Sequence, residues 1–445
     1  MSSIQNVAST LQENFGKELD KLARECGVVQ REREFTGQTL LLMIVLTLLE
    51  KPDASWSDFH ITASALDIAV SRTAIQKRFA DSQPLVDFFR SALENALKQT
   101  VAGEASSAKL LQRFTAVLVG DATTIALPDD LANLFPGCGG SVGTSGAALK
   151  IQVLWDLKTG TLVKMELEPG RASDAKSPIA VTEAEPGTLL VYDLGYFDLS
   201  RFATLDKQKV KYISRLQHGT HVFDTNGNRL DLLSVLRERK FGLVDMKVLL
   251  GASERLPCRL IAIPMPEEIA NRRRQQARDK AKNKGRTPTA EYLELLGWSL
   301  FITNSAKEDL TWKEVVVLYR ARWQIELLFK LWKSHNQLAT VRAGAKALEV
   351  LAVFYAKLLG VVLQNWILVA TAGANVNYSM TMAARALRGM VRMLARYLGN
   401  RARLEEELED LKRVIKNLGG TKKRKKDPSY AQLIDDAEFL TWLCE

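Results

Sequence analysis

The sequence predicts a mixed α/β protein in which a sheet-forming middle is flanked by helical regions. Residues 1–105 repeat apolar side chains at helical spacing, as in GQTLLLMIVLTLLEKP, and contain few strand signals. Residues 114–215 show three short β-rich runs, a helical link and a fourth β-rich run. Beyond Ala345 the apolar spacing is helical again. This order favours a mixed sheet with helices before and after it in the chain.

Composition narrows the class of protein. The chain has 445 residues, of which 47% are hydrophobic and 25% charged, as in a globular protein of several domains. Its four cysteines lie far apart, so we expect no disulfide framework, no zinc site and a reducing cytoplasm. The formal net charge of +10 favours a polyanionic partner, with nucleic acid first. The polar opening MSSIQNVASTLQENFGKELDKL predicts no signal peptide.

The helical N-terminal region contains a candidate DNA-binding motif. Residues 61–80 resemble a helix-turn-helix, in which we expect one helix to end near Val70 and Ser71 to cap the next. Four side chains would then project toward DNA: Arg72, Gln76, Lys77 and Arg78. The alternative is an ordinary surface helix in a bundle.

The C-terminal region contains the most apolar stretch, Val350–Ala374, which is long enough for a membrane span. Lys357, Gln364 and Asn365 interrupt it, so we expect a buried helix and no membrane contact.

Two aspartates follow runs of β-forming residues in the middle of the chain. Asp121 lies within FTAVLVGDATTIALP, and Asp193 follows the apolar part of TLLVYDLGYFDLSRF. Between them, LKIQVLWDLKTG and TLVKMELEPG predict a hairpin, and KQKVKYISRL predicts a later strand. We expect both carboxylates at the C-terminal ends of buried strands, where open α/β sheets hold ligands. The alternative is a pair of exposed acids that cap turns.

Two basic segments stand out from this pattern. Residues 215–296 look like a β-rich insertion that ends in a densely cationic arm, Arg272–Arg286, expected to be a solvated loop that follows phosphates. The alternative is a flexible linker. A second run, Lys422–Lys426, either does the same or keeps a terminal segment solvated.

The stretch YRARWQIELLFKLWKS, residues 319–334, contains one acidic residue and four basic residues. On a regular helix, at about 100° per residue, four polar side chains share an arc of about 60°: Tyr319, Arg322, Glu326 and Lys333. The apolar side chains fall on an adjacent flank: Leu318, Ile325, Leu328 and Trp332. With Asp121 and Asp193, Glu326 would complete a three-carboxylate site for two Mg²⁺ ions. The alternative is an intrahelical ion pair between Arg322 and Glu326.

The spacing Tyr319-x2-Arg322-x3-Glu326-x6-Lys333 resembles the YREK signature of bacterial insertion-sequence transposases of the DDE type. VGDATTIALP and VYDLGYFD resemble that family's two aspartate blocks, and GWSLFITN with the YREK helix resembles its C-terminal catalytic block. The resemblance covers residues 110–345. It implies a ribonuclease-H-like core with catalytic, metal-binding residues Asp121, Asp193 and Glu326, Mg²⁺ as cofactor and Mn²⁺ as a substitute.

The resemblance also implies a reaction and a domain organisation. A 3′ strand is hydrolysed at the transposon end, a hairpin forms and reopens, and the 3′-hydroxyl joins target DNA. The implied DNA contacts, with those of the helix-turn-helix, are Tyr319, Arg322, Lys333, Lys330, Trp298, Arg215, Arg72, Lys77 and Arg78. Trp298 would stack on an extruded base, and its alternative is a core position. The expected regions are a helical DNA-binding domain (1–105), a catalytic domain (106–214 and 297–345), the insertion (215–296) and a helical region with a dimerisation role (346–445).

We therefore expect a bacterial cytoplasmic, nucleoid-associated transposase that binds double-stranded DNA and forms a homodimer in the synaptic complex. Two other functions remain open. One is a catalytically silent repressor that occupies transposon ends, which end cleavage would exclude. The other is a structure-specific nuclease on the same core, which recovery of insertions would exclude.

Overall fold

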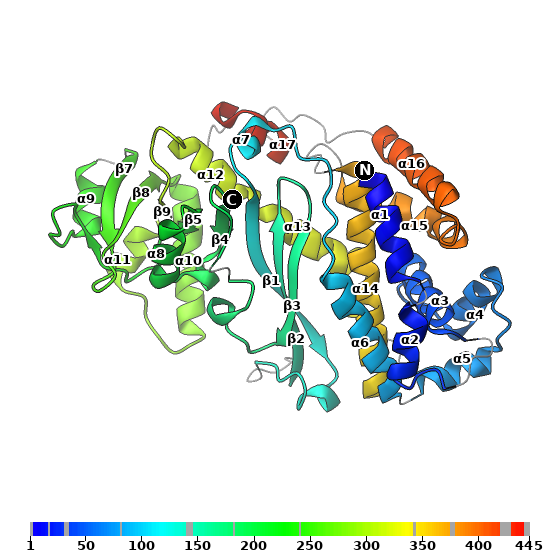
Figure 1. The fold of residues 1–445 in the computed structure, drawn as a ribbon. Helices are drawn as coiled ribbons and strands as arrows, with labels where there is room; N and C mark the ends of the chain where they lie inside the picture. The colour runs from blue at the N-terminus through cyan, green and yellow to red at the C-terminus, as the bar shows by residue number, and fades with distance from the viewer. Residues whose placement is uncertain are drawn as a thin grey trace. The chain divides into compact units, whose positions relative to one another are not determined.

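A computed structural model describes the chain over residues 3–16, 18–30, 35–80, 82–138, 146–180, 183–239, 242–340, 344–373, 379–418 and 429–439 (Figure 1). The chain divides into two compact units. The first unit comprises residues 1–107, 122–172 and 324–421, and the second comprises residues 108–121, 173–323 and 422–445. The basic run Lys422–Lys426 lies outside the described residues.

Nine strands among the described residues form one mixed sheet, in the order β3-β2-β1-β4-β5-β9-β8-β7-β6. The strands are β1 (Val117–Leu127), β2 (Ala147–Asp156), β3 (Leu162–Pro169), β4 (Leu189–Tyr192), β5 (Lys211–Arg215), β6 (Val222–Phe223), β7 (Val244–Leu250), β8 (Leu256–Pro264) and β9 (Trp298–Thr303). β4 runs parallel to β1 and β5, whereas β2 with β3 and the ladder β5-β9-β8-β7-β6 are antiparallel. The mixed α/β class and the hairpin over β2 and β3 are confirmed.

The first unit is built largely of helices. They are α1 (Ser3–Asn14), α2 (Glu18–Glu25), α3 (Gly37–Glu50), α4 (Trp56–Ala65), α5 (Arg72–Phe79), α6 (Gln83–Leu97), α14 (Ala347–Ala372), α15 (Met380–Arg396) and α16 (Arg401–Asn417). α14 packs against α1, α3, α6, α15 and α16. By length and composition α14 alone, among the described residues, would cross a membrane, but most of it is buried within the protein. That burial favours a core helix, which carries Lys357 and Gln364 inside.

In the candidate helix-turn-helix, the second helix agrees with the prediction, whereas the first helix ends earlier than predicted. Ser71 caps α5 by accepting a hydrogen bond from the backbone N–H of Ala74, as predicted. However, α4 ends at Ala65 rather than near Val70, because the backbone of Asp67 turns into the left-handed region, with φ of 57°. The connection between the two helices is therefore longer than expected.

The second unit contains the strands β4 to β9 and helices that include α8 (Leu199–Lys207), α9 (Leu232–Glu238), α10 (Glu267–Lys282), α11 (Ala290–Leu295) and α12 (Trp312–Ala321). The cationic arm was expected to be a loop, and this expectation was wrong for most of its length, because residues 267–282 form α10. Arg273 donates to the backbone O of Trp298, and Arg274 donates to the backbone O of Leu293. These bonds tie two of the arm's arginines to the sheet side of the unit, and its other cations remain exposed.

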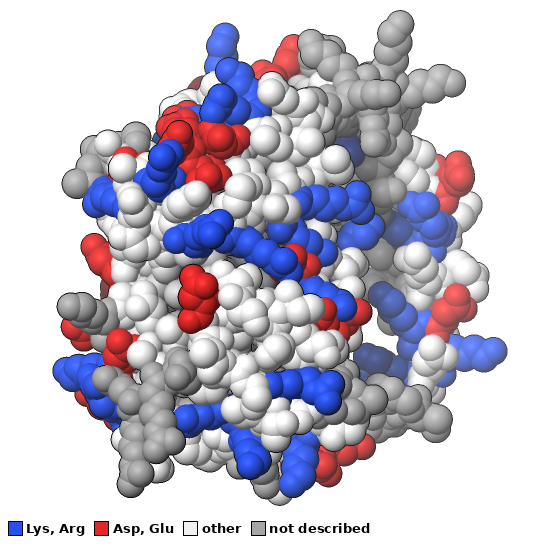
Figure 2. Space-filling model, turned by 90° about the vertical axis from the view of Figure 1, so that its right-hand side faces the viewer, with Lys and Arg blue, Asp and Glu red and all other residues white. Residues whose placement is uncertain are grey.

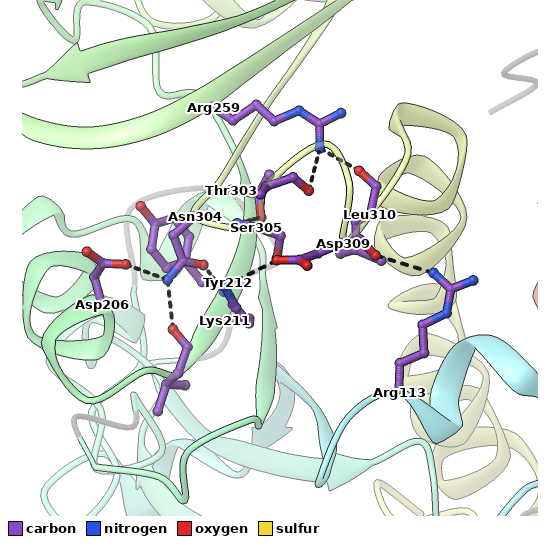
Figure 3. A network of polar contacts seen from close by, with 12 residues as sticks. Arg113, Asp206, Lys211, Tyr212, Arg259, Thr303, Asn304, Ser305, Asp309 and Leu310 are labelled. Atoms are coloured by element: carbon purple, nitrogen blue, oxygen red, sulfur yellow. Dashed lines mark hydrogen bonds and ion pairs between the residues drawn. The ribbon is translucent and has the colours of Figure 1, made fainter. Parts of the chain in front are cut away.

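A buried arginine connects the insertion strands to the loop before α12 (Figure 3). Arg259 on β8 forms a two-point ion pair with Asp245 on β7, with N–O distances of 2.6 and 2.7 Å, and both side chains are buried. Its Nη1 also donates to the backbone O of Leu310. Asn304 adds a second tie, because it donates to Asp206 and accepts from the backbone N–H of Tyr212. The start of α12 is therefore fixed by the insertion as well as by the core sheet.

Removing this guanidinium should be costly for folding. We expect Arg259→Met to lower the free energy of unfolding by about 3–5 kcal/mol, because Asp245 would be left as an uncompensated buried charge. Arg237→Gln is the matched control, since it breaks an exposed arginine–glutamate pair with Glu294 and should change the free energy of unfolding little, because solvent screens exposed ion pairs. Chemical denaturation at neutral pH measures both, and equal losses would contradict the role given to Arg259.

Candidate active site

Parallel pairing of β1 with β4 brings two acids to neighbouring positions. The last paired residues are Gly120 and Tyr192, and each is followed directly by an aspartate, Asp121 and Asp193. Neighbouring strands lie about 4.8 Å apart, so the two carboxylates arise side by side. Asp193 follows the end of β4, as predicted. Asp121 was expected at a strand end, but β1 continues through it to Leu127, so Asp121 lies at the end of the parallel ladder and within the strand.

Gly120 on β1 allows the ring of Tyr192 to lie close to the backbone of that strand. A Cβ atom on Gly120 would lie 2.6 Å from a ring carbon of Tyr192, which is closer than carbon atoms pack. The Tyr192 ring is buried, and its hydroxyl donates to the backbone O of Ile179. Gly120 thus lets the Tyr192 ring lie flat beside β1, immediately before Asp193.

The segment after Asp193 is held in place by a ring stack and by hydrogen bonds from Arg201. Tyr196 stacks on Tyr192 with ring centroids 5.2 Å apart. Arg201, a buried residue on α8, donates to the backbone O atoms of Tyr196 and Ala175. Arg201 could not be predicted as a site residue, because its partners are backbone carbonyls that no side-chain pattern reveals.

The start of α12 is fixed by a capping box. Thr311 and Glu314 exchange side-chain-to-backbone hydrogen bonds at the N-terminus of the helix. Arg113 adds an ion pair to Glu314, with an N–O distance of 2.7 Å, and this pair lowers the pKa of Glu314 against the opposing effect of burial. The orientation of α12 is therefore set at its start, two turns before Tyr319.

Tyr319, near the end of α12, contacts the second aspartate. Its hydroxyl donates to Asp193 Oδ1 over 3.3 Å, and its ring packs edge-on against Phe301 with centroids 5.2 Å apart. Burial, and then the charge of Asp193, raise the pKa of Tyr319 to about 12. The phenol therefore stays protonated at neutral pH and acts as a hydrogen-bond donor.

Arg322 contacts the first aspartate. Its Nη1 lies 2.8 Å from Asp121 Oδ2, and both side chains are largely buried. The guanidinium also lies over the Tyr319 ring, 6.0 Å from its centroid. Two residues of the YREK pattern thus hold the two aspartates, one by a charged contact and one by a neutral contact.

Two further predicted residues belong to this neighbourhood. Arg215, at the end of β5, lies over the rings of Phe301 and Tyr319, at 5.5 and 6.0 Å from their centroids. Trp298, the first residue of β9, is buried, with 5% of its surface exposed. The burial of Trp298 suits its core alternative, and its stacking role stays a prediction.

The helix that carries the YREK pattern is not regular, which corrects the expectation of one regular helix over residues 319–334. α12 ends at Ala321, Arg322 forms a turn, and α13 (Trp323–Lys330) leads into a π-helix over Leu331–His335. The wider π turn changes the angle per residue before Lys333 is reached. The predicted apolar flank is buried, whereas Glu326 is half-buried and Lys330 and Lys333 are exposed.

α14 holds the end of this segment. Asn336 and Gln364 exchange side-chain hydrogen bonds inside the first unit. The Lys357 ammonium donates to the backbone O atoms of Gln337 and Thr340. Those carbonyls favour the charged amine, but burial opposes it more strongly and lowers the pKa of Lys357 to about 8.

The donor chemistry of the two aspartates suits a hard divalent cation, since both offer carboxylate oxygens. Within the described ranges, no three His, Cys, Asp or Glu side chains come together as a metal-binding group. Asp121 is held by Arg322, and Glu326 belongs to the first unit. The three-carboxylate arrangement therefore stays a prediction.

The residues predicted for the helix-turn-helix differ in their surroundings. Arg72 and Lys77 are exposed on α5. Arg78 is half-buried, donates to the backbone O of Val28 and lies over the Phe35 ring. Arg78 thus contributes to packing within the first unit, while the other two remain accessible.

Comparison with known proteins gives consistent matches. A family model described as "Transposase DDE domain" matches residues 112–356. The transposase for insertion sequence element IS231E of Bacillus thuringiensis is 30% identical over 72% of this chain and 70% of that protein. The transposase for IS1151 of Clostridium perfringens is 24% identical over 81% and 80%. The putative transposase InsL for IS186A of Escherichia coli is 27% identical over 75% and 87%.

The contact between Gly120 and Tyr192 can be tested by adding one methyl group. We expect Gly120→Ala to lower the free energy of unfolding by about 1–3 kcal/mol, because the new Cβ would collide with the Tyr192 ring. Gly389→Ala is the control, since a Cβ there meets nothing within 4 Å and should stabilise α15 by up to about 1 kcal/mol. Urea denaturation of both variants checks the prediction, and a stabilised Gly120→Ala would contradict it.

Lys357 should give stability a specific pH dependence. Its folded pKa of about 8 lies below the ordinary lysine pKa of 10.5, so the unfolded chain binds the extra proton between these two pH values. The free energy of unfolding of the wild type, relative to Lys357→Met, should therefore rise from pH 8 to pH 10.5, by at most roughly 3 kcal/mol. Denaturation of both proteins across this range measures it. If the difference in the free energy of unfolding stays constant or falls with pH, the pKa of the buried Lys357 amine is not lowered by folding.

Proposed function

The chain belongs to the DDE transposase family of bacterial insertion sequences, and we propose that it cleaves the ends of its own element and joins them to target DNA. It is a DNA transposase, and transposases of this family generally use divalent metal ions. The detailed reaction, its metal and its DNA sites are the subject of the proposal.

The observation that carries the proposal is the pairing of each aspartate with a residue of the YREK pattern. Asp121 and Asp193 follow the last two residues of one parallel ladder, and Arg322 and Tyr319 contact them. Such neighbouring strand-end carboxylates are a common place for ligands in α/β sheets. A purely structural ion pair would not require a second acid with its own partner beside it.

Asp121, Asp193 and Glu326 are the residues that would hold the metal, for which we propose Mg²⁺, with Mn²⁺ as a substitute. When bound, the metal would activate the attacking oxygen and stabilise the leaving one. Arg322 contacts Oδ2 of Asp121, and we propose that metal binding displaces it from that oxygen. We propose that the guanidinium then takes a phosphate of the DNA end, for which its planar fork is suited.

Tyr319 has a complementary role. Its phenol stays protonated, since its pKa is raised to about 12, so it can donate to a phosphate oxygen or to Asp193 without adding charge. Arg215 lies over the same ring and brings a cation to the strand end. We propose that these two residues and the exposed Lys330 and Lys333 position the flanking phosphates.

The proposed reaction uses the same chemistry repeatedly. Water attacks a phosphodiester and releases a 3′-hydroxyl at the end of the element. That hydroxyl attacks the opposite strand to form a hairpin, water reopens the hairpin, and the 3′-hydroxyl finally attacks target DNA. In each step an oxygen nucleophile bonds to phosphorus while another oxygen leaves. The hairpin step needs an extruded base, for which Trp298 is the proposed stacking partner.

Synapsis of two ends would bring two copies of the chain together, and we propose a homodimer that acts in the bacterial cytoplasm on nucleoid DNA. The helical region after residue 345 is the proposed dimerisation region. Exposed apolar side chains of this region support the assignment, among them Met382, Met393 and Val414.

The test is cleavage of a labelled duplex that carries the inverted repeats flanking the gene, with Mg²⁺ present. The wild type should nick and join this DNA, and Glu326→Gln should lose cleavage by at least about 10³-fold while it still binds. Glu308→Gln is the matched control, because it removes the same charge from an exposed position and should cleave normally. Persistent cleavage by Glu326→Gln would remove Glu326 from the mechanism, and a wild type that binds without nicking would favour the repressor.

A further inference from the structure

Helix α15 carries four arginines on one face, a feature separate from the candidate active site. On this helix, at about 100° per residue, the four share an arc of about 80°: Arg385, Arg388, Arg392 and Arg396. We refer to these four residues as the α15 stripe. The opposite face is buried against the helical unit through Ala383, Ala384, Leu387, Val391 and Leu394. The four arginines therefore lie on the face of α15 opposite its buried side.

The charge of the α15 stripe is not balanced within its own helix. The sequence of α15, MTMAARALRGMVRMLAR, contains no acidic residue. The neighbouring helix α16 differs, because its arginines pair with acids of the same helix: Arg401 with Glu405, Arg403 with Glu406 and Arg413 with Asp410. A solvated surface helix usually has the α16 pattern. The α15 pattern instead leaves the positive charge of the stripe without an acidic partner in its own helix.

Two arginines of the stripe contact other parts of the first unit, and three of the four are exposed. Arg388 donates to the backbone O of His335 over 2.6 Å, and Arg392 forms an ion pair with Glu50 of α3 at 2.7 Å. Arg385, Arg392 and Arg396 are exposed. Figure 2 shows that Lys and Arg side chains are prominent over the face that includes the helices at the right of Figure 1, where α15 and α16 lie.

The stripe begins beside the segment that carries Lys333. Arg388 and Arg385 are both close enough to His335, the last residue of the π-helix, to help burial lower the pKa of that ring to about 4. His335 is therefore neutral near pH 7 and adds no charge of its own. The π-helix and the start of the α15 stripe therefore meet at His335 within the first unit.

From these observations we propose that the α15 stripe is a docking surface for the phosphate backbone of duplex DNA. From Arg385 to Arg396 the stripe extends about 16 Å, and each strand of B-DNA carries one phosphate per about 3.4 Å of its axis. Several phosphates therefore lie within reach of the stripe. Arginine is also suited to them, because its guanidinium binds phosphate oxygens in pairs. This inference rests on the proposed function, since it extends the DNA path of that site along α15.

The test measures binding of the full-length protein to a fluorescent mixed-sequence duplex of about 30 base pairs over a series of salt concentrations. The variant Arg385→Gln/Arg396→Gln removes two of the three exposed charges. The variant Arg403→Gln/Arg413→Gln is the matched control, because it removes the same charge from exposed positions of α16. Arg385→Lys/Arg396→Lys keeps the charge, and circular dichroism verifies that each variant is folded.

We expect the α15 glutamine variant to lower the magnitude of the slope of log K against log salt by about 2, at roughly 0.9 per lost contact. The α16 variant should leave the slope nearly unchanged, and the lysine variant should retain most of it. Equal slopes in the two glutamine variants would overturn the α15 surface, even if the wild type cleaves its end DNA. A wild type that does not bind the duplex would overturn it as well. A stripe-dependent slope in a protein that never cleaves would support the surface and reject the proposed function.

Discussion

The four-residue parallel ladder between β1 and β4 is the constraint on which the candidate site depends. It ends at Gly120 and Tyr192, so the residues that follow, Asp121 and Asp193, arise next to each other. Two carboxylates at one sheet position repel each other unless cations or hydrogen-bond donors separate their charges. The protein supplies one of each, a guanidinium to Asp121 and a phenol to Asp193. The pairing of β1 with β4 thus places two carboxylates close together, and the polar end of α12 reduces the repulsion between them.

The insertion takes part in that solution at a distance from the carboxylates. Arg259 and Asp245 form a buried pair on two insertion strands, and the same guanidinium binds the backbone O of Leu310 just before α12. The capping box and Arg113 then fix the first turn of the helix. Tyr319 and Arg322 lie at the other end of the same helix. A shift of the first turn of α12 would therefore displace both side chains from Asp193 and Asp121. The insertion is therefore part of the framework of the second unit.

Much of this could be predicted from the sequence, for identifiable reasons. The strand before Asp193 and the buried flank of the YREK helix could be predicted, because both depend on the spacing of apolar residues that are close together in the sequence. The continuation of β1 beyond Asp121 does not follow from an acid at the end of an apolar run, although the residues after it alternate between buried and exposed positions. The helical form of residues 267–282 could not be predicted, because dense charge does not by itself distinguish a solvated helix from a loop. The partner of Arg322 was also missed, since a contact across 201 positions leaves no local spacing. The three-carboxylate site itself stays a prediction.

The π-helix over Leu331–His335 has an electrostatic consequence for any polyanion near Lys333. The C-terminal end of a helix exposes carbonyl groups and carries the negative pole of its dipole, which repels phosphate. Here the carbonyls at and after that end are covered by cations from elsewhere in the first unit: Arg388 at His335, and Lys357 at Gln337 and Thr340. The negative pole is thereby masked from inside the protein. An approaching backbone would meet the ammonium of Lys333 without the opposing field of the helix that carries it.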